Sequence, residues 1–221
     1  MTAGSESSVC LLIDDFLPLP ELTQLLAYTI DREVDFADAT ILRNGSNLAS
    51  VDLGVRRIGL LPGADSVPPF VLRRLRQAVP ELARRLGHEV DESDSLEAHL
   101  TATGDGGFFL AHSDSSHPAV QTRSTTFVFF FSQNPRPFEG GELCVERDWR
   151  SGDRIYLQDN RHPDGLLQRR EVVDVIEPQV NRLVAFSSYR MHEVRPVRVQ
   201  SRAFASSRFT VTGALHRNRM G

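Results

Sequence analysis

Residues 107–131 read GFFLAHSDSSHPAVQTRSTTFVFFF and hold two strand-like runs with a polar interruption between them. The second run, STTFVFFF (124–131), is apolar at consecutive positions, which is typical of a strand buried on both faces in the middle of a core. The first run ends in His112-Ser113-Asp114. The stretch therefore predicts a β-rich core with a pair of polar side chains on one of its strands.

The region around this stretch shows the same pattern. From residue 95 onward, short strand-like runs are separated by Gly, Pro and Asn. The expected strands are SLEAHLTAT (95–103), GFFLAHSD (107–114), STTFVFFF (124–131), GELCVE (141–146), EVVDVIEP (171–178), NRLVAFSS (181–188), MHEVRPVRV (191–199) and RFTVTGAL (208–215). Eight short strands without a helix between them predict a barrel or jelly roll.

Two amphipathic helices are expected before these strands. The first starts near Pro20, and the second lies within PPFVLRRLRQAVPELARRL (68–86), where Pro80 is expected to kink or split it. Its apolar stripe consists of Leu72, Leu75, Val79, Leu82 and Leu86. Residues 34–66 favour no single structure, apart from a turn at Asn44-Gly45 and a charged strand-like segment around Arg56 and Arg57.

The composition excludes several classes of function. The chain has 221 residues, 40% of them hydrophobic, which is enough for one sizeable core. Its net charge is −4 and all 25 Lys and Arg residues are Arg, so nothing indicates a nucleic-acid partner and any fixed anion-binding cation must be arginine. Cys10 and Cys144 are too few for a disulfide framework, and MTAGSESS resembles no signal peptide. No apolar run approaches the ~20 residues that span a bilayer, so we expect a cytoplasmic protein.

The His-x-Asp pair admits several chemistries. Residues two apart on a strand project to the same face, so His112 and Asp114 point together. Such a pair suits a hydrogen-bonded couple, a general-base dyad or two ligands of a transition metal. An iron(II) site with two histidines and one carboxylate needs a second imidazole. Of the seven histidines, His192 alone starts a late strand directly after an apolar one, and it is our candidate.

Together these motifs resemble the iron(II)- and 2-oxoglutarate-dependent dioxygenases, in particular their prolyl 4-hydroxylase-like branch. The resemblance covers roughly residues 95–217. Its motifs occur in the expected order: GDGGFFLAHSD (104–114), FEGGEL (138–143), NRLVAFSSYRMHEVRPV (181–197) and SRFTVTGALHR (207–217). It is the order of the motifs that makes the resemblance specific.

The resemblance implies a set of site residues. His112, Asp114 and His192 would bind iron, and an arginine on the last core strand would bind the distal carboxylate of 2-oxoglutarate. Two arginines compete for that position. Arg202 has the spacing from His192 found in many relatives, but we favour Arg208, because a strand holds a guanidinium rigidly against a carboxylate. Thr210 shares the strand face of Arg208 and would add a hydroxyl.

The chain also departs from the family pattern. Many relatives carry tyrosines that contact the co-substrate on the strands before and after the His-x-Asp pair, where this chain has HLTAT and TTFVFFF. Either Thr101, Thr103 or His99 substitutes for a tyrosine, or the contact is absent. Ala214 stands where many relatives have Trp. Because Asp114 occupies a position that a halide would need on the iron, hydroxylation is expected in preference to halogenation.

The implied fold is α+β and mainly β, with a double-stranded β-helix core of the jelly-roll or cupin type and N-terminal helices packed against it. Residues 1–8 are expected to form a disordered tail, and residues 9–221 a single domain. Within it, residues 9–94 would support a core formed by residues 95–217.

The implied reaction uses iron(II), 2-oxoglutarate and O2, with ascorbate as reductant, to hydroxylate an unactivated carbon. The expected substrate is a prolyl residue of a protein or peptide; the alternative is a free amino acid or a natural-product intermediate. The long polar loop of residues 148–170 is either a substrate-recognising lid or a solvated insertion. Its candidate substrate contacts are Arg150, Tyr156 and Arg161. Nothing in the sequence defines an oligomeric state.

Two other kinds of protein fit parts of the pattern. A non-catalytic cupin-like module would use the barrel to bind a metal or ligand, without a need for Arg208 or the Gly-Gly-Glu-Leu segment. A zinc hydrolase would need a general base beside the metal. The only obvious neighbour for that purpose, Glu193, is expected to point away from His192 because it is the next residue on the strand.

Overall fold

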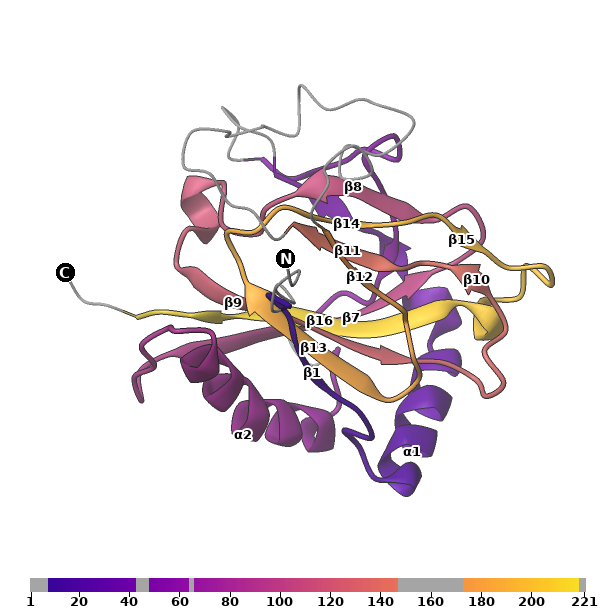
Figure 1. The fold of residues 1–221 in the computed structure, drawn as a ribbon. Coiled ribbons are helices and arrows are strands. Elements are labelled where there is room, and N and C mark those ends of the chain that lie inside the picture. The colour runs from indigo at the N-terminus through magenta and orange to yellow at the C-terminus, as the bar shows by residue number, and fades with distance from the viewer. Residues whose placement is uncertain (1–7, 43–47, 64–65, 147–172, 219–221) are drawn as a thin grey trace, which may run out of the picture.

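Two β-sheets and two helices make up most of this computed structural model, which describes residues 8–42, 48–63, 66–146 and 173–218. The sheets lie face to face, and both helices pack on the outer side of the larger sheet (Figure 1). The expectation of a mainly β chain with a few N-terminal helices is confirmed. The expected tail, the Asn44-Gly45 turn and the loop of residues 148–170 lie wholly or almost wholly outside the described residues.

The larger sheet has seven strands, and each pair of neighbours is antiparallel. In sheet order they are β1 (Leu11–Ile13), β13 (Arg182–Ser187), β9 (Arg123–Phe131), β16 (Arg208–His216), β7 (Ser95–Thr103), β6 (Gly59–Leu60) and β2 (Ala37–Asp38). The expected C-terminal strand thus lies in the centre of this sheet, between β9 and β7.

The smaller sheet has five strands. In sheet order they are β12 (Val173–Ile176), β11 (Leu143–Glu146), β14 (His192–Val194), β8 (Phe108–His112) and β5 (Arg56–Arg57). Two short pairs complete the strands: β10 (Glu139–Gly140) with β15 (Val197–Arg198), and β3 (Thr40–Ile41) with β4 (Ser50–Val51). Short 3-10 turns occur at η1 (Glu33–Asp35), η2 (Pro118–Val120) and η4 (Phe204–Ser206).

Side-chain alternation gives the larger sheet two different faces. On β9, Phe127, Phe129 and Phe131 belong to the main hydrophobic core on the helix side, whereas Thr126 and Val128 line a cavity on the other side. Strand β16 alternates in the same way, because Phe209, Val211 and Leu215 join the core, whereas Arg208, Thr210, Thr212 and Ala214 line the cavity. Both faces of β9 are buried, as the run TTFVFFF predicted.

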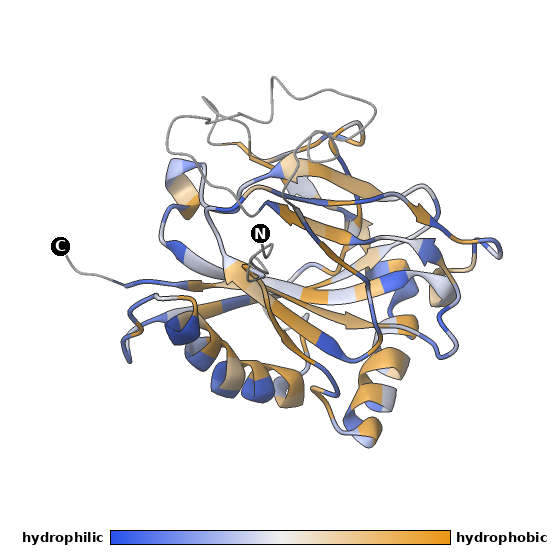
Figure 2. Ribbon diagram, viewed as in Figure 1, coloured by the Kyte–Doolittle hydropathy of each residue, from blue (hydrophilic) through white to orange (hydrophobic). Residues whose placement is uncertain are grey.

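Helices α1 (Leu19–Ile30) and α2 (Pro69–Arg85) cover the apolar face of this sheet, with the orange stripe of each turned towards it in Figure 2. Helix α2 continues through Pro80 without a break, so the proline does not split it. Its buried stripe differs from the expected one at two positions, since Val71 and Ala83 are fully buried, whereas Leu72 and Leu86 are only partly buried. No helix within the described residues is both long and apolar enough to cross a membrane.

Two expected strands have different limits in the structure. The strand predicted for residues 107–114 ends at His112, so Asp114 lies beyond it. The strand predicted for residues 191–199 divides into β14 and β15. The ambiguous segment 34–66 contributes two-residue strands, one of which, β5, adds an edge strand beside β8.

Candidate functional site

Three side chains from the smaller sheet and the turn after it converge at one point. His112 ends β8 and His192 begins β14, and the two residues face each other in the register of these strands. Asp114 follows in the turn after β8. The backbone N–H of Asp114 donates to the Ser188 carbonyl at 3.0 Å. Its carboxylate oxygens lie 3.5 Å from His112 Nε2 and 3.6 Å from His192 Nε2. All three ligand atoms lie within 4.8 Å of one another.

Both imidazoles are oriented by the same local contact. His112 Nδ1 donates to the carbonyl of Leu110 at 2.8 Å, and His192 Nδ1 donates to the carbonyl of Arg190 at 3.0 Å. Because a carbonyl only accepts, each Nδ1 carries the proton and each Nε2 presents its lone pair towards Asp114. This is the arrangement that a divalent transition metal requires of its histidine ligands.

The protonation states of His192 and Asp114 also suit a metal. Burial, reinforced by His112, lowers the pKa of His192 to about 4, so its ring is neutral at neutral pH. Burial would raise the pKa of Asp114, but the two imidazoles and Arg123 lower it on balance, and the group is a carboxylate. Thr126 supports that charge, because its hydroxyl donates to Asp114 Oδ2 at 2.7 Å.

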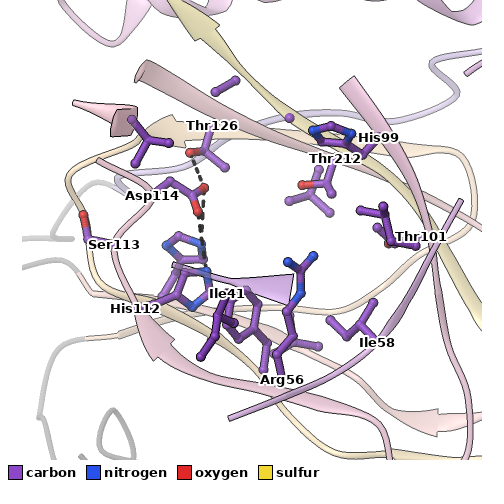
Figure 3. A pocket seen from close by; sticks show the side chains of 18 of the residues that line it. Ile41, Arg56, Ile58, His99, Thr101, His112, Ser113, Asp114, Thr126 and Thr212 are labelled. Atoms are coloured by element: carbon purple, nitrogen blue, oxygen red, sulfur yellow. Dashed lines mark hydrogen bonds and ion pairs between the residues drawn. The ribbon is translucent and has the colours of Figure 1, made fainter. Parts of the chain in front are cut away.

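The trio opens into a cavity of about 430 Å³ between the two sheets. Figure 3 shows His112 and Asp114 at one side of this space and Thr101 and Ile58 at the other. Among the described residues that line it, Asp114 is the only one with a carboxylate. Glu193 does not line the cavity and lies opposite Cys144 in the register of β11 and β14, which confirms that it points away from the site.

Arg208 also lines the cavity, as its predicted function requires. It is the first residue of β16 and only 2% exposed. Its Nε donates to the Gly141 carbonyl at 2.8 Å, while its Nη2 is buried and has no hydrogen-bond partner within the described chain. Burial lowers the pKa of Arg208 to about 9, so the guanidinium is still charged at neutral pH. A buried charge with a free donor is a site for an anion.

The competing arginine lies elsewhere. Arg202 has a φ of +51° in the connection before β16, and its side chain is 83% exposed. It forms a 3.6 Å ion pair with Asp105 and does not line the cavity. The structure therefore brings Arg208, and not Arg202, into the same space as the histidines.

The Gly-Gly pair of the FEGGEL motif makes room for Arg208. Gly141 has a φ of +73°, which favours glycine, and a Cβ there would lie 2.7 Å from Arg208 Cδ and 2.9 Å from Val197 Cγ2. A Cβ on Gly140 would collide with the Pro196 carbonyl. The motif thus allows the backbone to approach the guanidinium closely enough to accept its hydrogen bond.

The candidate tyrosine substitutes Thr101, Thr103 and His99 have different environments, and Thr210, the predicted partner of Arg208, lies beside one of them. Thr210 and Thr101 lie opposite each other in β16 and β7, with their hydroxyl oxygens 2.5 Å apart, and both line the cavity. His99 lines it too, and its Nε2 lies 2.7 Å from Glu97 Oε1. Thr103 is buried outside the cavity lining. Within the described parts of the chain, the structure thus places hydroxyl groups from Thr101 and Thr210, but no tyrosine, among the residues lining the cavity.

Three cavity residues with titratable side chains were not predicted as site residues: Arg56, His117 and Arg123. Arg123 donates from Nε and Nη2 to Glu97 at 2.8 to 3.0 Å, so its charge is already paired. His117 Nδ1 accepts from the Ala119 N–H at 3.1 Å, which leaves the proton on Nε2. The sequence predicts a charged strand-like segment around Arg56 and Arg57, but two residues show no periodicity that would assign either side chain to the cavity face of a sheet. Arg150, Tyr156 and Arg161 lie outside the described residues.

Comparisons with known proteins agree with this geometry. A PKHD-type hydroxylase of Synechocystis sp., described as uncharacterized, is 29% identical over 202 residues. The match covers 91% of this chain and 61% of the relative, so the chain spans less than two thirds of that protein's length.

Two solved structures share the fold. A prolyl-4-hydroxylase from Pseudomonas putida has a TM-score of 0.62 and 19% identity, with 96% of this chain and 94% of that chain covered. A prolyl hydroxylase from Trichoplax adhaerens, in complex with a peptide fragment of the hypoxia inducible factor oxygen degradation domain, has a TM-score of 0.62 and 18% identity, with 94% and 83% covered. At these identities the likeness concerns the fold.

The family model for the 2OG-Fe(II) oxygenase superfamily matches residues 98–216, which is more than half of the chain. The matched region contains His112, Asp114, His192 and Arg208. The chain belongs to the 2OG-Fe(II) oxygenase superfamily.

Proposed function

We propose that this protein is an iron(II)- and 2-oxoglutarate-dependent dioxygenase that hydroxylates an unactivated carbon. The observation that carries the proposal is the convergence of two histidine Nε2 lone pairs and one carboxylate at a cavity that also holds an unsatisfied arginine. Two histidines and a carboxylate that leave neighbouring coordination positions open are the ligand set of non-haem iron(II) oxygenases. His112, Asp114 and His192 are the proposed iron ligands.

The residues fit both groups that the family uses. Ligands bonded at about 2.1 Å in neighbouring positions of a metal lie about 3 Å apart, close to the 3.5 and 3.6 Å between the carboxylate of Asp114 and the two Nε2 atoms. When bound, iron(II) with 2-oxoglutarate and O2 supplies the oxidising chemistry, with ascorbate as reductant, and 2-oxoglutarate leaves as succinate and carbon dioxide.

The chain's own residues hold and orient these groups. Arg208 would bind the distal carboxylate of 2-oxoglutarate through Nη2, and the Thr210 hydroxyl would add a hydrogen bond from the same strand face. Thr126 would fix the orientation of Asp114 through its 2.7 Å hydrogen bond. The contacts from Nδ1 of each histidine would keep Nε2 deprotonated and directed at the metal.

We infer that the two facing sheets form the double-stranded β-helix of this family. The antiparallel order of both sheets and the two likenesses with TM-scores of 0.62 support this inference. A non-catalytic cupin-like module is less well supported, since it would not need a buried arginine beside the metal ligands. A zinc hydrolase lacks support because the described cavity lining has no second carboxylate to act as general base.

For the substrate we favour a prolyl residue of a protein or peptide, with a free amino acid or a natural-product intermediate as the alternative. Support for proline comes from the likeness to two prolyl hydroxylases, one of them solved in complex with a peptide fragment, and from the PKHD-type hydroxylase of Synechocystis sp.. Because such likenesses concern fold and family, the substrate must be established by experiment.

The test is to incubate the purified protein with iron(II), ascorbate and 2-oxoglutarate, together with proline-containing peptides in one arm and pools of small molecules in the other. Formation of succinate with the gain of one oxygen atom on a peptide is the expected result. Oxygen gain on a small molecule alone would reject the peptide substrate. Absence of succinate from iron-loaded wild-type protein in both arms, or succinate formation that needs no iron, would reject the dioxygenase.

A further inference from the structure

Arg56 is a second arginine in the cavity, and the proposed binding of iron and 2-oxoglutarate does not use it. It is the first residue of β5, the edge strand that pairs with β8 beside the proposed iron ligand His112. Figure 3 shows its side chain directed into the space between His112 and Thr101. Arg57, the next residue, is exposed and does not line the cavity.

The guanidinium of Arg56 is held from one side. Its Nη1 donates to the Thr40 carbonyl at 3.0 Å, and its Cζ lies 4.8 Å from the centre of the Phe109 ring. Phe109 in turn stacks on His112, with ring centres 3.6 Å apart. These contacts place the Arg56 charge at a defined position relative to the proposed metal ligands.

The opposite edge of the guanidinium is free. Arg56 Nε is buried without a hydrogen-bond partner, and none is seen for Nη2 within the described parts of the chain. Nε and Nη2 are the two donors that lie side by side on one edge of an arginine side chain, and they form a two-pronged contact with a carboxylate. The edge left open is therefore the one that suits a carboxylate.

The charge of Arg56 lacks a fixed counter-charge. Burial lowers its pKa to about 10, which Asp114 opposes and Arg123 reinforces, so the guanidinium stays charged at neutral pH. Of the other charged cavity residues, Arg123 is paired with Glu97, and Asp114 belongs to the proposed metal ligands. Arg56 is partly buried, with its Nε fully buried, and a cation in such a position is costly unless an anion joins it.

The bound cofactors would not supply that anion. The two positive charges of iron(II) and the one of Arg208 are matched by Asp114 and by the two carboxylates of 2-oxoglutarate. Arg56 then remains as one unmatched positive charge in the described cavity lining. One negative charge is left for the substrate to bring.

We propose that Arg56 binds a carboxylate of the substrate through Nε and Nη2, and hence that the substrate is an acid. This inference rests on the proposed function, because it takes iron and 2-oxoglutarate as the other occupants of the cavity. The carboxylate belongs either to a free amino acid or to an acidic residue of a peptide. A neutral prolyl peptide would leave the Arg56 charge unmatched.

The test measures binding without turnover, on protein that carries zinc in place of iron and saturating 2-oxoglutarate. Two matched pairs of probes differ only in charge. L-proline and L-prolinamide represent a free amino acid, and the N-acetylated amides of Glu-Pro-Ala and Gln-Pro-Ala represent an acidic peptide and its neutral counterpart. Affinities are measured by calorimetry for wild type, for Arg56→Gln and for the matched control Arg57→Gln.

In wild type and in Arg57→Gln, the carboxylate of at least one pair should bind about tenfold or more tightly than its neutral counterpart. In Arg56→Gln, neither pair should show this preference. The pair that shows it identifies the source of the carboxylate. Arg56→Lys, which keeps the charge but not the two-pronged edge, should retain part of the preference. Melting temperatures of the variants confirm that each is folded.

Three results would overturn the inference. The first is that wild type shows no carboxylate preference for either pair, or binds no probe at all, and the second is that a preference persists in Arg56→Gln. The third is a loss of 2-oxoglutarate affinity in Arg56→Gln as large as that in Arg208→Ala. The last would assign Arg56 to the co-substrate. Failure of the zinc-loaded wild-type protein to bind 2-oxoglutarate would instead reject the proposed function, and a carboxylate preference that depends on Arg56 would still stand.

Discussion

His112 and His192 owe their ligand geometry to a contact that each makes with its own segment of chain. Each Nδ1 donates to the carbonyl two residues earlier, from Leu110 or Arg190. Asp114, in contrast, depends on distant residues, because Thr126 and the Ser188 carbonyl orient its side chain and its backbone. At the scale of the residue, the two imidazoles are oriented locally and the carboxylate by tertiary contacts.

Replacement of Asp114 by Ala should remove one of the three proposed metal ligands and the carboxylate that accepts the hydrogen bond of the Thr126 hydroxyl, while the fold remains. We expect metal affinity to fall by at least tenfold, and succinate formation to be lost, because second-sphere changes alone already cost about 10- to 100-fold. Calorimetric titration with iron(II) under anaerobic conditions measures the affinity, and circular dichroism checks the fold. Near-normal turnover by a fully iron-loaded variant would show that Asp114 is no ligand.

The two candidate arginines are separated by a paired substitution. Arg208→Ala should weaken 2-oxoglutarate binding by about 2–5 kcal/mol, because it leaves a carboxylate in the cavity without its partner. Arg202→Ala should have little effect, since that side chain is 83% exposed and lies outside the cavity lining. Co-substrate titrations of both variants provide the comparison, and the reverse order of effects would assign the carboxylate to Arg202.

Strand β16 and the Gly140-Gly141 turn form one unit at the scale of the element. The strand presents Arg208 and Thr210 to the cavity and Phe209 and Val211 to the helix-side core, and the turn lets the chain pass against the arginine. Because alternation on one strand serves both packing and binding, a shift of register by one residue would exchange the two sets.

Gly141→Ala tests this unit. The added Cβ would lie 2.7 Å from Arg208 Cδ, so we expect the guanidinium to move and 2-oxoglutarate affinity to fall by at least tenfold, with a loss of stability of about 1–3 kcal/mol. Gly87→Ala is the control, because Gly87 also has a positive φ, +83°, but no atom within 4 Å of the added Cβ. Calorimetry and urea unfolding compare the two. Equal effects of both substitutions on 2-oxoglutarate affinity would contradict the account of the glycine pair.

At the scale of the whole molecule, the site exists only between the sheets. The smaller sheet and the turn after β8 contribute the three proposed metal ligands, and the larger sheet contributes Arg208, Thr210 and Thr101. The helices pack on the far face of the larger sheet and leave its polar face to the cavity (Figure 1). Binding of metal and co-substrate should therefore stabilise the contact between the sheets.

The metal-free protein should lose stability in acid because of His192. Burial lowers the pKa of this residue to about 4 in the folded protein, whereas in the unfolded chain it is about 6.5. Between these values only the unfolded chain binds the proton, so the free energy of unfolding falls as the pH drops from about 6.5 to about 4, by roughly 3 kcal/mol from this residue. Urea unfolding of metal-free wild type and His192→Asn across this range should give a shallower dependence for the variant; parallel curves would refute the assignment.

Much of this protein could be read from local patterns. Short apolar runs bounded by Gly, Pro and Asn predicted β7, β9, β13 and β16, and strand position together with family resemblance made His112, His192 and Arg208 the candidate site residues. These features are predictable because the direction of a side chain depends on the backbone of its own strand. Three of the five expected stripe residues of α2, Leu75, Val79 and Leu82, are fully buried for the same reason.

Other features depended on which distant segments meet. Asp114 lies beyond the end of its strand and is held by Ser188 and Thr126, and the two-residue strand β5 carries Arg56 into the cavity only because it pairs with β8. Neither contact leaves a periodic signal, since a turn or a two-residue strand is too short to show one. Only the tertiary structure decided which residues line the cavity together with Arg208. The reason is that the pairing of strands remote in sequence is selected by the packing of the whole core and not by any one segment.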